Sequence, residues 1–253
     1  LPCESRTYEL TGHTLPPGRS RYTFDEVVNA SATASALDYE KDPTAGRLEK
    51  RLIEHVRTYY RRNNLAGSLP LGSVQSLALP SESYKLAFTP GLVADVYGGR
   101  VSDAMLANEG RYVHTEGDAN WWIPSGRIFY SPDPAHTPPQ ELAYARRHFF
   151  LPHRYRDPFH TPAVSTESFV TYDAYDFLVE ETRDALDNRV TAGERHVDPT
   201  QPLARRSQDY RVLQPVLVMD PNRNRSAVAF DALGMVVGTA VMGAVAVNAR
   251  FLP

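Results

Sequence analysis

The residues best suited to metal chemistry form a short histidine-rich segment. His148, His153 and His160 lie close together in the chain, with Arg154–Asp157 among them. Imidazole nitrogens bind zinc, so one hypothesis is a metal-dependent hydrolase. Their spacing matches no ligand motif such as H-E-x-x-H, and polar residues inside or at the edge of a β-rich shell explain them better. We therefore predict no catalytic residue, no metal site and no cofactor.

A second acidic segment imitates a calcium-binding loop. The imitating positions are Asp220, Asn222, Asn224, Ser226 and Asp231. The sixth position of such a loop is a glycine that permits a sharp turn, and here it is Arg225. Aspartate and asparagine side chains that cap a β-turn account for the same residues, so the sequence favours a turn.

Other candidate sites are weaker still. The pair Trp121-Trp122 suits stacking on a sugar, which leaves a surface adhesion or carbohydrate-binding module open, but a core or interface anchor is the commoner role. Cys3 is the single cysteine, and without a base beside it we expect a small buried apolar residue. Ser125 lies in a turn and not in a nucleophile elbow.

The charge of the chain argues against a nucleic-acid partner. The net charge is -3, and 24 of the 27 basic residues are arginine. Because arginine tolerates partial burial and pairs bidentately with carboxylates, this bias suits a β-shell rich in interfaces. One cysteine excludes an intrachain disulfide, so the redox compartment stays open.

The sequence begins at Leu1 without the features of a signal peptide, and its ends resemble cuts in a longer protein. The candidate membrane segment, Ala232–Val247, has sixteen uncharged residues, whereas a spanning helix needs about 20. Its glycines and valines favour a strand, so no membrane insertion is predicted.

The elements expected near the C-terminus form a β-meander. Three short apolar runs, 215–219, 227–230 and 235–242, are separated by the turn signals Asp220–Asn222 and Asp231–Gly234. Apolar runs of this length bounded by Asp, Asn, Pro and Gly are typical of antiparallel strands.

The same pattern occurs earlier in the chain. An aromatic-Asp-Ala element and an Asp-x-x-x-Asn-Arg element recur in the same order of strand and turn. The residues of these structural repeat motifs are Tyr172, Asp173, Asp184, Asn188, Arg189, Asp220, Asn224, Arg225, Phe230, Asp231 and Gly234. We interpret them as a degenerate repeat of hairpins, each of which buries its face only against the next.

The expected organisation has three parts. Residues 1–147 form a mixed, mostly β segment with short helices at about 91–97, 102–108 and 138–147. Residues 148–243 form the hairpin repeats, and 244–253 are an atypical tail. Within the first part, the apolar residues of 47–62 fall on one face at helical spacing. Strand alternation also fits, with Ile53, His55, Arg57 and Tyr59 against Leu52, Val56 and Tyr60, but periodicity alone favours a helix.

Several motifs together resemble the B component of bacterial insecticidal toxin complexes (Tc toxins), which is related to the Rhs/YD-repeat proteins. The segments that carry the resemblance are Leu1–Arg6, Arg51–Thr58, Leu69–Gly72, Tyr84–Thr89, Trp121–Gly126, Arg156–Phe159 and Tyr210–Thr239. None is a catalytic signature; their order and number are specific.

The resemblance implies a segment between the β-propeller and the Rhs repeats of that family. In the family, the B and C components wind a β-sheet into a hollow shell that holds an unfolded toxic effector until the channel of the A component delivers it. The expected fold class is thus mainly β, with antiparallel hairpin or meander repeats and a few short helices. The expected role is non-enzymatic, in a secreted complex, and the resemblance turns 47–62 into strand. Two departures are a loop between Asp157 and Tyr172 longer than its counterpart and the tail after Gly243.

Overall fold

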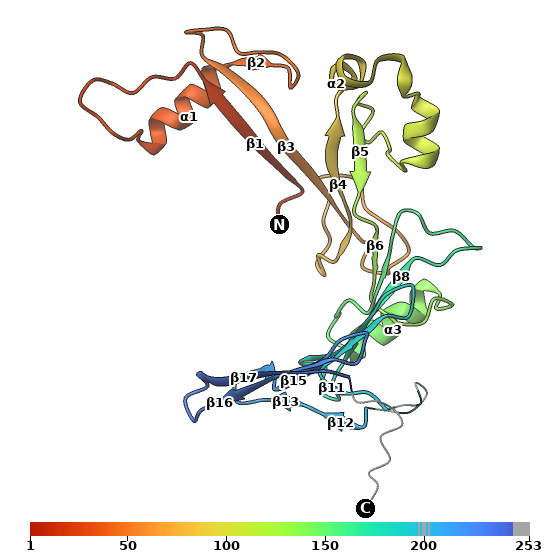
Figure 1. The fold of residues 1–253 in the computed structure, drawn as a ribbon. Coiled ribbons are helices and arrows are strands. Elements are labelled where there is room, and N and C mark those ends of the chain that lie inside the picture. The colour runs from red at the N-terminus through yellow and green to blue at the C-terminus, as the bar shows by residue number, and fades with distance from the viewer. Residues whose placement is uncertain (197, 199–200, 202, 245–253) are drawn as a thin grey trace, which may run out of the picture. The chain divides into compact units, whose positions relative to one another are not determined.

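The computed structural model describes residues 1–196, 198, 201 and 203–244 of the chain (Figure 1). The chain forms two compact units, Leu1–Arg127 and Ile128–Pro253. Both are built mainly from antiparallel strands with a few short helices, which confirms the predicted fold class. The predicted atypical tail lies, from residue 245 onward, outside the described residues.

The first unit contains a five-stranded sheet and several short helices. Its elements are β1 (Glu4–Thr11), α1 (Phe24–Thr33), β2 (Ser35–Leu37), β3 (Glu49–Tyr60), β4 (Pro80–Phe88), α2 (Pro90–Leu92), a π-helical turn (Val93–Tyr97), a 3₁₀ turn (Gly98–Arg100), a second π-helical turn (Met105–Glu109) and β5 (Trp121–Pro124).

The long strand β3 organises this sheet. Along one edge it pairs antiparallel with β1, from Glu4 opposite Arg57 to Thr11 opposite Glu49. Its other edge pairs with β2 at the start and with β4 at the end, and β5 then pairs with β4 (Figure 1). The helix that periodicity predicts over 47–62 is therefore wrong, and the strand that the resemblance implies is confirmed.

Local chemistry explains where the helices of this unit begin. Thr23 caps α1 in a capping box: its hydroxyl accepts from the Glu26 amide, and the Glu26 carboxylate accepts from the Thr23 amide. Ser102, at the start of the second expected helix, accepts a hydrogen bond from the Met105 amide at 3.3 Å. Each cap satisfies an amide that would otherwise lack a partner.

The core of the first unit gathers around the tryptophan pair. Trp122 is 0% exposed, and Trp121 is buried beside it. Leu65, Leu79 and Tyr60 are also buried. The burial of both tryptophans confirms that they anchor the core, whereas Cys3, just before β1, is only half-buried and not the buried residue that was expected.

The second unit contains an eight-stranded sheet with the order β17-β16-β15-β10-β9-β8-β7-β6. Its elements are β6 (Arg127–Phe129), α3 (Pro138–Arg147), β7 (Arg154–Arg156), β8 (Glu167–Tyr172), β9 (Val179–Arg183), β10 (Arg189–Thr191), β11 (Gly193–Glu194), β12 (Arg205–Arg206), β13 (Gln208–Asp209), β14 (Gln214–Pro215), β15 (Leu217–Met219), β16 (Arg225–Phe230) and β17 (Val236–Met242).

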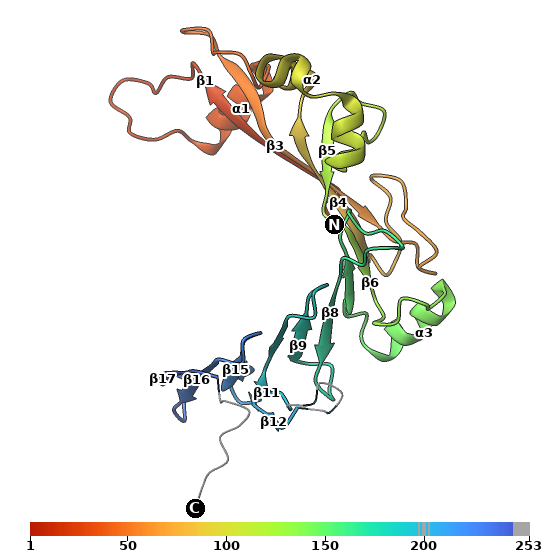
Figure 2. The same cartoon turned by 45° about the vertical axis from the view of Figure 1, so that its right-hand side comes forward.

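In the eight-stranded sheet, strands that follow one another in the chain lie side by side (Figure 2). One interruption occurs, where two small ribbons, β11–β12 and β13–β14, lie between β10 and β15 in the chain. Helix α3 begins as predicted, with two prolines in its first turn and a capping box from Thr137 to Gln140.

Among the residues described, no helix is long and apolar enough to cross a membrane. The described part of the candidate span Ala232–Val247 contains the turn at Gly234 and the strand β17.

Candidate functional site

The structure places the repeat-motif residues in four turns of one geometry. Asp173, Asp184, Asp220 and Asp231 each follow a strand, and the strands before the first and last turns end at Tyr172 and Phe230. In each turn the residue three positions later donates its amide to the aspartate carbonyl, and that residue has a positive φ. A type I turn followed by one left-handed residue is a common hairpin connection.

The aspartate side chains organise these turns. Asp184 accepts from the Leu186 and Asn188 amides and from Asn188 Nδ2, each at 2.9 Å. Asp220 accepts from the amide and Nδ2 of Asn224 at 2.8 and 2.9 Å. These bonds explain why Asn stands four residues after Asp, and they use the carboxylate that a calcium site would need.

The remaining motif residues continue the pattern. Arg189 and Arg225 begin the strands after their turns, and Arg225 pairs with Glu194 at 2.9 Å. Gly234 supplies the left-handed residue of the last turn, with a φ of 83°. A Cβ there would lie 2.7 Å from a methyl of Val212, so the close approach favours glycine at this turn, whereas Asp176, Asp187 and Arg223 adopt a positive φ at the same position of the other three turns.

The first of these aspartates is the most constrained. Asp173 Oδ1 accepts from the amides of Tyr175, Phe177 and Leu178, and Oδ2 accepts from the Tyr210 hydroxyl at 2.7 Å. Burial raises the pKa of Asp173, but these donors outweigh it and lower the pKa below the usual 3.8.

We expect Asp173→Ala to lower the free energy of unfolding by about 2 kcal/mol, because it leaves several donors without their charged acceptor. Asp184→Ala, in a solvent-exposed turn, serves as the matched comparison and should cost less. Since the folded pKa is lowered, the contribution of Asp173 is complete above the unfolded pKa and is lost as pH falls through the folded pKa. Urea unfolding at pH 7 and pH 3 measures both effects; equal losses for the two variants would contradict this ranking.

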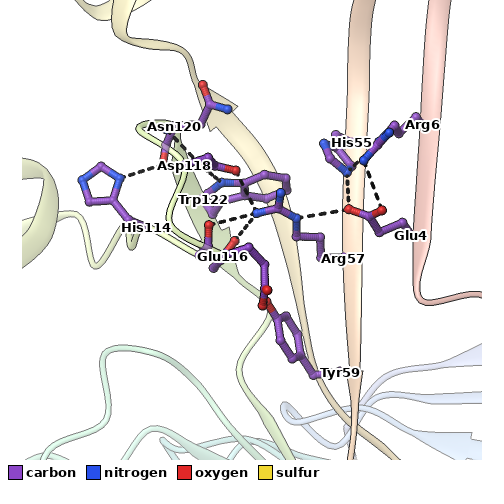
Figure 3. Close-up of polar contacts among 11 residues, drawn as sticks. Glu4, Arg6, His55, Arg57, Tyr59, His114, Glu116, Asp118, Asn120 and Trp122 are labelled. Carbon is purple, nitrogen blue, oxygen red and sulfur yellow. Dashed lines mark hydrogen bonds and ion pairs between the residues drawn. The ribbon is translucent and has the colours of Figure 1, made fainter. Parts of the chain in front are cut away.

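A second candidate site is a buried charge network in the first unit (Figure 3). Arg57, on β3, is 8% exposed and stacks over the Trp122 ring at 4.0 Å. Its guanidinium lies 3.3 Å from Glu4 Oε1 and 2.9 Å from Asp118 Oδ2. It also donates to the Thr115 carbonyl at 3.1 Å, so one arginine joins β1, β3 and the loop before β5.

His55 extends this network on the side of β1. Its Nε2 lies 3.2 Å from Arg6 Nε and 3.0 Å from Glu4 Oε1. That nitrogen accepts from Arg6 only when unprotonated and donates to Glu4 only when protonated. Burial lowers the pKa of His55, which favours the unprotonated ring. Burial alone would raise the pKa of Glu4, but hydrogen bonds with His55 and Arg57 lower it, so Glu4 is an anion at neutral pH.

The second unit contains a comparable network. Arg154 and Glu167 are both buried and form a direct ion pair, and Arg156 NH2 lies 2.7 Å from the same carboxylate oxygen. Arg154 and Arg156 stack over the Phe129 ring at 3.9 and 4.8 Å. In both units an arginine on an aromatic ring pairs with a carboxylate of a neighbouring strand. Because these carboxylates are held by charged hydrogen bonds from arginine, the networks suit the alignment of strands.

The three candidate histidines, His148, His153 and His160, do not form one group in the structure. His148 and His153 lie beside each other, with ring centroids 5.7 Å apart, and Asp176 joins them from the β8–β9 turn. His160 is held elsewhere, where its Nδ1 accepts from the Thr166 amide at 3.3 Å. Among the described residues, the group with the composition of a metal site is His148, His153 and Asp176, and it does not include His160.

No protein-family model matches the chain, and no curated protein sequence matches it. Solved structures do. The crystal structure of TcdB2-TccC3-Cdc42 is similar with a TM-score of 0.50 and 18% identity, over 78% of this chain. This chain shares the fold of one segment of that protein. TcdB2-TccC3 without its hypervariable C-terminal region has a TM-score of 0.49 and 18% identity over 81% of this chain. The Photorhabdus luminescens Tc holotoxin pore has a TM-score of 0.49 and 20% identity over 77% of this chain.

The similar region is a small part of those proteins. The chain covers 8% of the TcdB2-TccC3-Cdc42 chain and of the holotoxin chain, and 9% of the form without the hypervariable region. At this identity the likeness establishes the fold alone.

Proposed function

We propose that this chain is a structural, non-enzymatic segment of a toxin-complex B component and forms part of the wall of a β-shell. The shell would enclose an unfolded toxic effector. Its partners would be the C component, which carries the effector, and the channel-forming A component, in a secreted assembly. The observation that carries this proposal is the fold shared with a segment of TcdB2-TccC3-Cdc42 over 78% of the chain.

The form of the second sheet supports a wall. In the eight-stranded sheet, the hairpins β8–β9, β9–β10, β15–β16 and β16–β17 are closed by the same aspartate-anchored turn, so the same unit can be repeated to extend the sheet. At the β17 end of the sheet order, side chains on both faces are exposed, and Val241 is 85% exposed. A strand edge with exposed apolar side chains is suited to pair with more sheet.

The two charge networks also fit a structural role. Each fixes neighbouring strands through a buried arginine whose partners are carboxylates, and neither leaves a carboxylate free to act as a base. The arginine bias of the sequence thus has a physical use, because a guanidinium can stack on a ring and pair at the same time.

The test is effector protection from protease. The B component that contains this chain is co-expressed with a C component whose effector is replaced by a reporter peptide, and the assembly is treated with protease. We expect a protected reporter in the intact assembly and a digested reporter when residues 128–244 are deleted. A reporter that stays protected after the deletion would refute a wall function.

Because a deletion can disturb folding, a milder variant is needed. Asp173→Ala combined with Asp220→Ala weakens two turns and should increase reporter digestion. The control Asp187→Asn leaves the anchoring aspartate at the start of every turn unchanged and should not increase digestion. Equal digestion with both variants would also count against the proposal.

A further inference from the structure

A group of three side chains in the second unit has the composition of a metal site. His148, at the C-terminal end of α3, His153, just before β7, and Asp176, in the β8–β9 turn, each offer one ligand atom. These atoms all lie within 4.8 Å of one another. Three chain segments therefore converge on one point, although the sequence predicts no metal there.

The buried histidine is the decisive member. His153 is 4% exposed, and its Nε2 is buried without a hydrogen-bond partner. A buried polar nitrogen without a partner costs free energy, so an occupant is expected at this position.

The other two side chains complete a plausible ligand set. His148 Nδ1 lies 3.0 and 2.9 Å from the two carboxylate oxygens of Asp176. Ligand atoms around tetrahedral zinc are about 3.3 Å apart, so this pair is already near that spacing and His153 must close a small gap. Tyr144 stacks on His148 at 4.1 Å, and Tyr172 lies edge-on to His153 at 5.1 Å. The aromatic rings restrict how the imidazoles can turn.

We propose that His148, His153 and Asp176 bind one divalent transition-metal ion of the zinc class, with water completing its coordination. Two imidazoles and one carboxylate favour such an ion over Mg²⁺ or Ca²⁺, which prefer oxygen ligands. His148 and Asp176 are partly exposed, so the ion can enter from solvent. The bound ion links α3 to the β8–β9 turn. This inference does not depend on the proposed toxin-complex function.

The experiment titrates the metal-free 253-residue chain with Zn²⁺ at pH 7.5, and follows binding by calorimetry and stability by thermal unfolding. We expect one ion per chain and a rise in Tm, with no comparable rise from Mg²⁺. Co²⁺ should give the visible absorption of a tetrahedral site. Lowering the pH to 5.5 should weaken binding, because protons compete for the imidazoles.

Two variants and two matched controls locate the site. Asp176→Asn keeps a residue that tolerates the positive φ of 55° at this position, and His148→Gln removes the more exposed imidazole. Each should weaken Zn²⁺ binding at least tenfold and abolish the Tm rise. Asp187→Asn changes the corresponding residue of the next turn, and His160→Gln removes the nearby histidine outside the cluster; both should bind as the unchanged chain does.

Two results would overturn the proposal. The first is no stoichiometric Zn²⁺ binding to the unchanged chain, which would mean that water satisfies His153 Nε2. The second is equal binding by Asp176→Asn, His148→Gln and the controls, which would assign the ion to surface histidines.

Discussion

Glu167→Gln is expected to lower the free energy of unfolding by about 3 to 5 kcal/mol, the range found when one partner of a buried ion pair is removed. Glu167 is 4% exposed, and its Oε1 faces both Arg154 and Arg156. Without the Glu167 carboxylate, the two guanidinium groups over the Phe129 ring lose the anion that they share. Burial already lowers the pKa of Arg154, which indicates the cost that Glu167 offsets.

The matched control is Glu181→Gln. Glu181 also lies on a strand of the eight-stranded sheet, but it is partly exposed and lies 3.9 Å from Arg189. Its replacement should cost less than about 1 kcal/mol, as for other solvent-accessible pairs. Urea unfolding measures both variants. A loss below 1 kcal/mol for Glu167→Gln would mean that water reaches the arginines and that the pair is not desolvated.

A double variant separates pairing from packing. In Arg154→Met with Glu167→Leu, neither buried charge remains, and apolar side chains of similar size fill the space. We expect this double variant to be more stable than Glu167→Gln alone, because the unpaired charge is gone. If instead its loss is larger, the polar network itself holds β7 and β8 in register.

The turns of the second sheet were the part of the fold most open to prediction from the sequence. Asp184 bonds to Asn188, and Asp220 to Asn224, within one stretch of five residues. Because these turns depend only on residues close together in the chain, the local sequence is enough to predict them. The strands that flank them follow from the same signals, since apolar runs of this length have few alternatives.

The strand β3 could not be predicted from periodicity, and the reason is chemical. Its most buried side chains include Glu49, His55 and Arg57, which an analysis of apolar spacing assigns to the surface. With these positions discounted, the remaining apolar residues fit a helix. Positions 55 and 57 do alternate as a strand requires, but the burial of these polar side chains becomes clear only once their carboxylate partner is known.

Long-range partners set the other limit. Glu4 pairs with Arg57 across 53 positions, and Asp176 joins His148 across 28. Neither pair has a spacing that a motif could record, because the register of the sheet brings them together. Spacing along the sequence therefore indicates His160, which is close to His153 in the chain. It gives no indication of Asp176, which lies close to His148 and His153 in the structure.

Arg57→Met is the second large effect expected, a loss of about 3 kcal/mol. The variant retains most of the apolar volume of the side chain but removes the charge between Glu4 and Asp118, which are 3.3 and 2.9 Å from the guanidinium. It also removes the stacking of a cation on Trp122, worth about 0.5 to 2 kcal/mol in other proteins. The stability of Arg57→Lys should lie between those of the unchanged chain and Arg57→Met, because an ammonium keeps the charge but lacks the planar guanidinium that pairs with two partners at once.

Arg6→Met is the control, since Arg6 pairs with the same Glu4 at 3.1 Å from an exposed position and should change stability by at most about 0.5 kcal/mol. The pH dependence adds an independent reading. In the unchanged chain the lowered pKa of Glu4 contributes stability above its unfolded value, and that contribution is lost as pH falls through the folded pKa. Removing Arg57 raises the pKa of Glu4 and so reduces this acid-dependent loss. A variant as sensitive to acid as the unchanged chain would show that Arg57 positions the loop of Asp118 rather than stabilising Glu4.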